Sequence, residues 1–154
     1  MKVSPYTGFF KPLNPQKYIG NPLEIVYRSK LELKFMFYLD RHPDILEWQS
    51  EEFSIPYLSS IDGRMHRYFP DFKIKKKNKD GLIETIVVEI KPSNMLLKPK
   101  QPKKKITKKY IAETKTWIIN NNKFEAAKEY CSRQMYKFVI ITEKDLGITY
   151  GSTI

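Results

Sequence analysis

The chain has 154 residues, 41% of them hydrophobic and 14% aromatic, which suits one domain with a packed core and argues against a disordered chain. It carries 28 Lys and Arg against 17 Asp and Glu, and the resulting net charge of +11 favours contact with a polyanion such as nucleic acid. A single cysteine excludes an intrachain disulfide and a cysteine-rich zinc site, and the absence of a long apolar run predicts no membrane partner.

The first 26 residues contain four prolines and no periodic apolar pattern; the prolines are Pro5, Pro12, Pro15 and Pro22. Proline lacks a backbone N–H, so this density favours irregular, extended backbone. The sequence therefore predicts an extended N-terminal arm over residues 1–26, which could be ordered by wrapping the core. A single domain is expected over residues 27–154.

The clearest helix is predicted over residues 27–40. Leu31, Phe35 and Leu39 recur at i, i+4 and i+8, which places them on one apolar face. Pro43 ends the pattern.

Three strands are predicted after this helix. Residues 51–58 alternate between apolar and polar, and Asp62-Gly63 then marks a tight turn before a second strand over residues 65–75. A third strand, residues 82–90, follows Asp80-Gly81 and is rich in β-branched residues, which is typical of a strand buried on both faces.

The remaining chain alternates helix and strand after a basic connection. Residues 91–109 are polar, basic and interrupted by prolines. A short helix is expected over residues 110–119, and Asn122 can cap a second helix with Cys131 buried on its apolar side. Residues 136–142 form a last short strand. The order of elements predicts an α/β fold with a mixed central sheet flanked by helices.

Two short stretches carry groups suited to phosphodiester hydrolysis. Asp71 follows Pro70, and Glu89 and Lys91 lie at the end of the third strand. Strand side chains repeat with period two, so Glu89 and Lys91 share a face, and a hairpin would bring Asp71 beside Glu89. Paired carboxylates suit a hard divalent cation, and a lysine can stabilise charge developing on a phosphate.

Glu32, on the predicted first helix, is a candidate third carboxylate. It would act through a metal-bound water or a second metal ion. The alternative is an ordinary ion pair on a basic helix, with Arg28 or Lys34 as the partner.

The order and spacing of Glu32, Pro70-Asp71 and Glu89-Ile90-Lys91 resemble the PD-(D/E)XK nuclease superfamily. Longer stretches are similar to the head completion nucleases of large tailed phages and, more distantly, to restriction-like end-cleaving nucleases of transposons. These stretches are residues 27–32, 48–52, 55–57, 66–72, 89–92 and the region from Trp117 to Glu143.

The resemblance implies a restriction-endonuclease-like core and a DNA endonuclease that uses Mg²⁺ or Mn²⁺. Asp71, Glu89 and the backbone carbonyl of Ile90 would bind the metal, with Glu32 joining through a water molecule, and Lys91 would complete the catalytic set. The expected substrate is double-stranded phage DNA after packaging and before tail attachment. Portal or neck proteins are the implied partners, and the host cytoplasm during assembly, then the virion head or neck, the implied locations.

A lysine-rich run over residues 98–109 holds seven lysines in twelve positions. A solvated loop is the common outcome for such a run, but its place directly after Lys91 favours tracking of DNA phosphates. The candidate DNA-binding residues are Arg28, Lys98, Lys100, Gln101, Lys103, Lys104, Lys105, Lys108 and Lys109. The main alternative function is a non-catalytic DNA-binding or neck-assembly protein that keeps the nuclease fold; a ribonuclease is a second.

Overall fold

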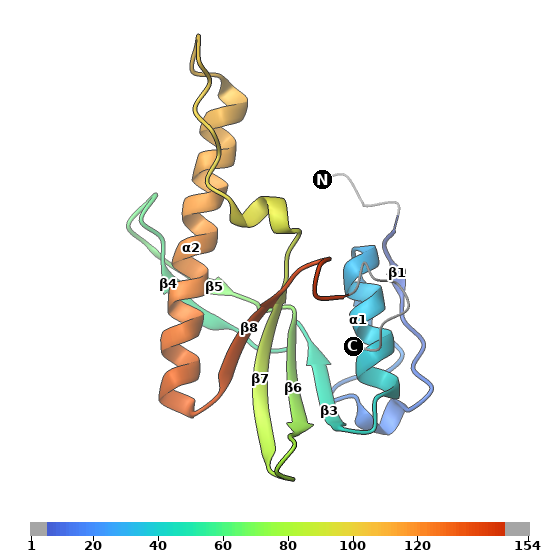
Figure 1. Ribbon diagram of the computed structural model, residues 1–154. Coiled ribbons are helices and arrows are strands. Elements are labelled where there is room, and N and C mark those ends of the chain that lie inside the picture. Colours follow the sequence, from blue (N-terminus) through green and yellow to red (C-terminus); the bar gives the residue numbers. More distant parts are fainter. Residues whose placement is uncertain (1–5, 147–154) are drawn as a thin grey trace.

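The computed structural model describes residues 6–146 (Figure 1). Two helices, two 3-10 turns and eight strands follow one another along the chain. They are β1 (Gly8–Phe9), η1 (Pro15–Lys17), β2 (Val26–Tyr27), α1 (Lys30–Arg41), β3 (Ile45–Ser50), β4 (Ile55–Leu58), β5 (Met65–Tyr68), β6 (Phe72–Lys77), β7 (Ile83–Ile90), η2 (Ser93–Leu96), α2 (Lys108–Gln134) and β8 (Lys137–Ile141).

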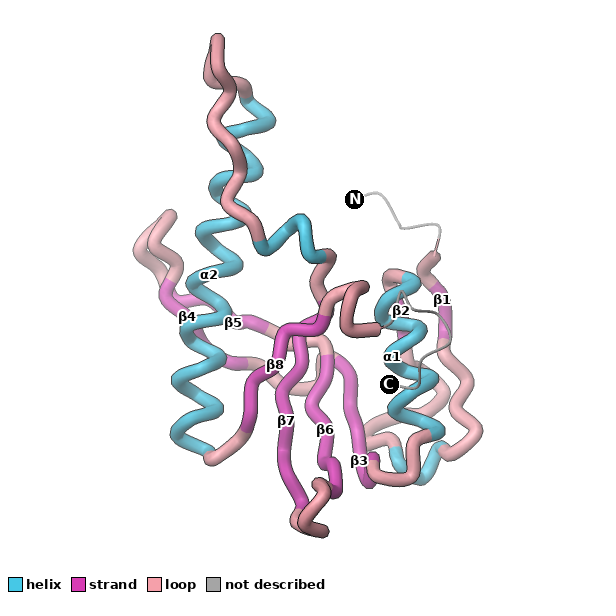
Figure 2. The backbone as a smooth tube through the Cα atoms, viewed as in Figure 1, coloured by secondary structure: helices cyan, strands magenta, loops and turns pink. Residues whose placement is uncertain are grey.

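A four-stranded mixed sheet forms the centre of the molecule, with strand order β3-β6-β7-β8. Strand β6 pairs antiparallel with both β3 and β7. Strand β8 lies parallel to β7 after the crossover through α2. Two short hairpin-like pairs, β1-β2 and β4-β5, lie outside this sheet (Figure 2). The predicted α/β fold with a mixed sheet and flanking helices is therefore confirmed, and it is consistent with a restriction-endonuclease-like fold.

Helix α1 packs its apolar stripe against one face of the sheet. Phe35, Met36 and Leu39 are buried there, and they join Trp48 of β3 and Phe72 of β6 in the main hydrophobic cluster. Burial of each such side chain contributes about 1.5–3 kcal/mol. The period-two alternation of β7 leaves Glu89 on the opposite face from its buried neighbours Val88 and Ile90.

Helix α2 and the β4-β5 pair cover the other face of the sheet. Ile55, Tyr57 and Tyr68 pack with Ala127 in a second cluster, against which Phe138 of β8 is partly buried. Cys131 is buried as predicted, and burial raises the pKa of its thiol to about 11. The thiol is therefore a small apolar group of the core rather than a nucleophile.

Residues 1–5 of the predicted N-terminal arm lie outside the described residues, and the rest of the arm, largely irregular, wraps the core. Phe10, Tyr18 and Ile25 are buried in the main cluster. The carboxylate of Asp40 accepts hydrogen bonds from the backbone N–H groups of Leu13 and Asn14, both at 2.9 Å. The arm is thereby fastened to the C-terminal end of α1.

The structure corrects three of the predicted elements. Strand β3 was missing from the prediction, which placed its first strand at residues 51–58, whereas β4 begins only at Ile55. The single strand expected over residues 65–75 is two strands in different sheets. The buried Pro70 lies between them, and it cannot donate to a sheet ladder.

The third correction concerns the helices. Residues 108–134 form one continuous helix instead of two, since this stretch contains neither glycine nor proline. Asn122 does not cap a helix; its side-chain oxygen accepts hydrogen bonds from the backbone N–H and hydroxyl of Ser60. Within residues 6–146, neither helix has the length and apolar character needed to cross a membrane.

Candidate active site

Asp71 lies just before β6, where the hairpin brings it to β7. The register pairs Phe72 with Val88, so Asp71 falls opposite Glu89, as the hairpin hypothesis predicted. One oxygen of Asp71 accepts a hydrogen bond of 2.7 Å from the backbone N–H of Ile90. The end of β7 therefore holds the Asp71 carboxylate in place.

Glu32 reaches the same region from the first turn of α1. Ser29 caps this helix by accepting a hydrogen bond from the backbone N–H of Glu32, and the Glu32 carboxylate accepts one from the backbone N–H of Arg28 at 2.5 Å. This reciprocal arrangement is close to a capping box. It fixes the direction in which the Glu32 side chain leaves the helix.

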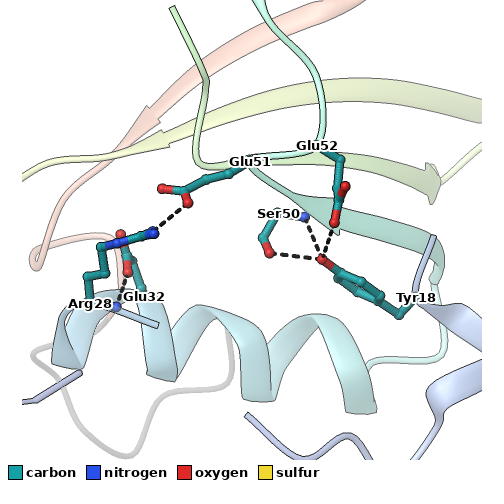
Figure 3. Close-up of polar contacts among 6 residues, drawn as sticks. All are labelled: Tyr18, Arg28, Glu32, Ser50, Glu51 and Glu52. Carbon is teal, nitrogen blue, oxygen red and sulfur yellow. Dashed lines mark hydrogen bonds and ion pairs between the residues drawn. The ribbon is translucent and has the colours of Figure 1, made fainter. Parts of the chain in front are cut away.

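Glu51 is a third carboxylate at the site, and the sequence prediction missed it as a site residue. It follows β3 in the left-handed region, with φ of 54°, and its backbone N–H donates to the Asp71 carbonyl at 3.2 Å. Non-glycine residues rarely adopt this conformation, and such strain is concentrated at functional sites. Figure 3 shows Glu51 directed toward Arg28 and Glu32, while the adjacent Glu52 turns toward Tyr18.

One carboxylate oxygen from each of Glu32, Glu51 and Asp71 lies within 4.8 Å of the others. The guanidinium of Arg28 forms an ion pair with Glu51, so it offsets part of the charge (Figure 3). Burial raises the pKa of Asp71 well above its usual range, and the nearby Glu89 and Glu32 raise it further. Burial and the charge of Glu51 likewise raise the pKa of Glu32.

Burial and the neighbouring carboxylates thus both disfavour the charged forms of Asp71 and Glu32. Oxygen donors gathered at such spacing are the ligands that Mg²⁺ and Mn²⁺ prefer. The acidic triad could therefore bind a divalent cation, which would offset the repulsion among Glu32, Glu51 and Asp71.

Glu89 and Lys91 form the second part of the site, next to the triad. The ammonium of Lys91 lies 3.3 Å from one Glu89 oxygen, and the other Glu89 oxygen accepts a 2.7 Å hydrogen bond from the Tyr68 hydroxyl. Glu89 and Lys91 share a face of β7, as their spacing predicted. Burial raises the pKa of Tyr68, and the charge of Glu89 raises it further, which keeps this hydroxyl a donor.

Lys123 brings a further positive charge from α2. Its ammonium lies 5.7 Å from the centre of the Tyr68 ring. Burial lowers the pKa of Lys123, and the like charge of Lys91 lowers it further, while Glu89 and Asp71 act in the opposite direction. The charge of Lys123 therefore interacts with the charged residues of the site.

The structure thus brings together the four residues expected to be catalytic, namely Glu32, Asp71, Glu89 and Lys91. Of the expected metal ligands, Asp71 lies in the triad. Ile90, whose carbonyl was the expected ligand, donates a hydrogen bond to Asp71 through its backbone N–H. Glu89 lies beside the triad, paired with Lys91 and Tyr68.

The candidate DNA-binding residues separate into two groups. Arg28 lies at the site, paired with Glu51. The others belong to the segment after η2 and to the start of α2, which together project away from the sheet (Figure 1). These exposed side chains are Lys98, Lys100, Gln101, Lys103, Lys104, Lys105, Lys108 and Lys109.

Two comparisons with known proteins agree with this geometry. The family profile described as "TnsA-like endonuclease N terminal" matches residues 42–143, a stretch that holds Glu51, Asp71, Glu89 and Lys91. The chain is also similar to the head completion nuclease of Enterobacteria phage T4. The two are 36% identical over 144 residues, which cover 92% of this chain and 93% of that protein.

Proposed function

The chain belongs to the TnsA-like endonuclease family, and from this membership we propose that it hydrolyses DNA phosphodiester bonds with the help of Mg²⁺ or Mn²⁺. The observation that carries the proposal is the convergence of Glu32, Glu51 and Asp71 beside the Glu89–Lys91 pair. Double-stranded DNA is the proposed substrate, since the net charge of +11 favours a polyanion.

In this proposal Asp71 is the central ligand, because it belongs to the triad and also faces Glu89. Glu32 and Glu51 complete the oxygen set, and the Ile90 carbonyl and Glu89 are the further ligands that the superfamily pattern implies. Three carboxylates, from α1, the β3-β4 connection and the residue before β6, would hold a divalent cation there. Such a cation would supply the polarisation of a phosphoryl oxygen and the lowered pKa of a water molecule.

Lys91 is the cation that the chain itself directs at the reacting phosphate. Glu89 holds its ammonium, and Tyr68 holds Glu89, so the charge is placed before the substrate arrives. A preorganised charge stabilises the developing phosphorane more than a mobile one does. Tyr68 is accordingly a positioning residue, and Lys123 reinforces the positive potential on the same side.

The test is cleavage of linear and supercoiled duplex DNA with Mg²⁺ or Mn²⁺. We expect wild-type protein to cut only with metal, and Asp71→Asn and Lys91→Ala each to lose about 100-fold or more in rate. Asp80→Asn and Lys79→Ala, both exposed in the β6-β7 turn, are matched controls that should keep full activity. Equal cutting by Asp71→Asn and wild type would overturn the proposed site.

We further propose that the biological process is head completion, because the relative of 36% identity carries that name. The DNA would then be phage DNA after packaging and before tail attachment. Portal or neck proteins would be partners, in the host cytoplasm during assembly or in the finished head or neck. The rival is a non-catalytic DNA-binding or neck-assembly protein. Metal-dependent cleavage that is lost in Asp71→Asn would exclude the rival. No cleavage by wild-type protein, together with full restoration of infectious particles by Asp71→Asn in a phage lacking the protein, would support it.

A further inference from the structure

A groove of about 720 Å³ lies between α2 and the segment that leaves the active site. Its walls come from η2, from residues 97–100 and from one side of α2 between residues 112 and 120. Figure 2 shows this segment leaving β7, turning through η2 and then running along the projecting part of α2. A volume of about 300–1,000 Å³ is typical of sites for small ligand-sized groups, and far too small for a double helix.

Asn120 lines the groove with an amide that no described protein group occupies. The residue is 7% exposed, and no hydrogen bond to another described residue engages its amide group. Its neighbours behave differently: the Asn121 amide donates to the Trp117 carbonyl, and Asn122 accepts from Ser60. The Asn120 amide is therefore open to the groove, where it can donate a hydrogen bond to an incoming group and accept one from it.

The groove also offers an aromatic face and positive charge. Trp117 lines it and is only partly buried. The ammonium of Lys98 lies 5.9 Å from the centre of its ring, and Lys100 lies on the same wall. An aromatic ring, an amide and two cations together match the three parts of a nucleotide, which are a base face, a base edge and a phosphate.

Two short stretches of chain connect the groove to the active site. Asn120 is three residues before Lys123 on α2, so the two side chains lie about one helical turn apart on one face of the helix. The Lys123 ammonium lies 5.7 Å from the centre of the Tyr68 ring, and the Tyr68 hydroxyl donates to Glu89. On the opposite wall, Asn94 follows Lys91 by three residues. A strand whose phosphate lies at Lys91 can therefore extend along α2 into the groove.

We propose that the groove binds an unpaired nucleotide of the DNA strand that is cut, with its base against Trp117, its base edge on Asn120 and its phosphate near Lys98 and Lys100. This inference rests on the proposed nuclease function and narrows its substrate class. The preferred DNA would carry a frayed end, flap or single-stranded junction beside the cut, because a fully paired base cannot enter.

The first test measures binding without cleavage. Wild-type protein in EDTA is titrated with a ten-nucleotide single strand while tryptophan fluorescence is followed. Trp48 is 1% exposed, so quenching would report Trp117. We expect quenching that disappears in Trp117→Phe. We expect the dissociation constant from fluorescence anisotropy of a labelled strand to rise about 5- to 20-fold in Asn120→Ala and Trp117→Leu.

Asn121→Ala is the matched control, because Asn121 is an exposed residue of the same type next to Asn120 on the same helix. It should bind like wild type. Lys98→Gln with Lys100→Gln gives a second variant at exposed positions, where folding is not at risk, and it should also weaken binding. Thermal unfolding of each variant separates lost binding from lost structure.

The second test compares cutting of blunt duplexes with duplexes that carry an unpaired flap. Wild type should cut the flapped DNA faster, and Asn120→Ala should lose this preference while still cutting the blunt duplex. If Asn120→Ala and Trp117→Leu bind single strands and cut flaps as wild type does, the groove proposal is wrong and the nuclease stands. If wild type cuts neither substrate with Mg²⁺ or Mn²⁺, the proposed nuclease function itself fails.

Discussion

At the scale of one residue, Asp71 shows that the site lowers the stability of the fold. Its carboxylate is largely enclosed and faces Glu32, Glu51 and Glu89, with one backbone N–H as compensation. Like charges at this spacing favour the protonated form and disfavour the charged form. Without a bound cation, the cluster therefore lowers the free energy of unfolding at neutral pH.

We expect Asp71→Asn to raise the free energy of unfolding in EDTA at neutral pH, because it removes a buried charge from a cluster of like charges. The change should fall within the range of about 0.5–3 kcal/mol that is usual for a single substitution. The asparagine oxygen can still accept from Ile90. Urea denaturation followed by circular dichroism gives the measurement, with Asp80→Asn as a surface control. A less stable Asp71→Asn protein would contradict the repulsion inferred here.

Glu51 and Glu52 offer a paired test of the metal site. Glu51 lies within the triad, whereas Glu52 accepts from the Tyr18 hydroxyl (Figure 3). We expect Glu51→Gln to weaken Mn²⁺ binding about 10-fold or more, because one of three charged ligands is lost. Glu52→Gln should leave the affinity within about twofold. Isothermal titration calorimetry measures both, and equal affinities in the two variants would exclude Glu51 as a ligand.

The residues of the site were predictable where strand periodicity determines position. Asp71, Glu89 and Lys91 follow from period two and a hairpin. Glu51 does not, because its direction depends on a left-handed backbone conformation that no neighbouring glycine announces. Lys123 is one lysine among many, and its approach to the site depends on how α2 packs against the β4-β5 pair.

At the scale of elements, one buried side chain of α1 provides hydrogen bonds to the irregular backbone of the N-terminal arm. Asp40 is 1% exposed and satisfies two backbone N–H groups of the arm, those of Leu13 and Asn14. Irregular backbone cannot satisfy these groups through a helix or sheet, so a side chain does so.

We expect Asp40→Ala to lower the free energy of unfolding by about 3 kcal/mol, because it removes two charge-assisted hydrogen bonds. Hydrogen exchange should become faster at Leu13 and Asn14. Asp44→Ala, at an exposed position nearby, should change stability by less than about 0.5 kcal/mol. Unchanged exchange at Leu13 and Asn14 in Asp40→Ala would show that other contacts hold the arm.

Elements with strong local patterns were predicted, and those defined by distant contacts were not. The 3.6 period of Leu31, Phe35 and Leu39 located α1, and the β-branched run located β7. Strand β3 was missed because residues 45–50 are half polar, and their pairing with β6 decides their conformation. Asn122 suggested a cap, yet its side-chain oxygen is engaged in a tertiary contact with Ser60.

At the scale of the whole molecule, a group of lysines projects away from the site. Helix α2 has 27 residues, about 40 Å, and its N-terminal part projects beyond the sheet beside the lysine-rich segment (Figure 1). Lys103, Lys104 and Lys105 are exposed there. The lysine-rich segment and the start of α2 would contact DNA phosphates at a distance from the cut.

We expect replacement of Lys103, Lys104 and Lys105 by glutamine to reduce the salt dependence of DNA binding. Each lost phosphate contact lowers the slope of log K against log salt by about 0.9, so the slope should fall by about 2 to 3. Glutamine at Lys76, Lys77 and Lys79, near the opposite end of the sheet, is the charge-matched control. Equal slopes in both triple variants would mean that the projecting segment does not touch DNA.

The order of strands in the sheet bears on the order in which the proposed active site forms. Strands β6 and β7 pair across a short turn, and β3 pairs with β6 after the β4-β5 pair, whereas β8 reaches β7 only after the long crossover through α2. Contacts between distant parts of a chain form late in folding. The backbone N–H of Lys91 bonds to Ile141 at the end of β8, so the position of that lysine is secured by the last pairing event. Before β8 pairs, the backbone of Lys91 lacks this partner, so the proposed active site would be complete only when the sheet has closed.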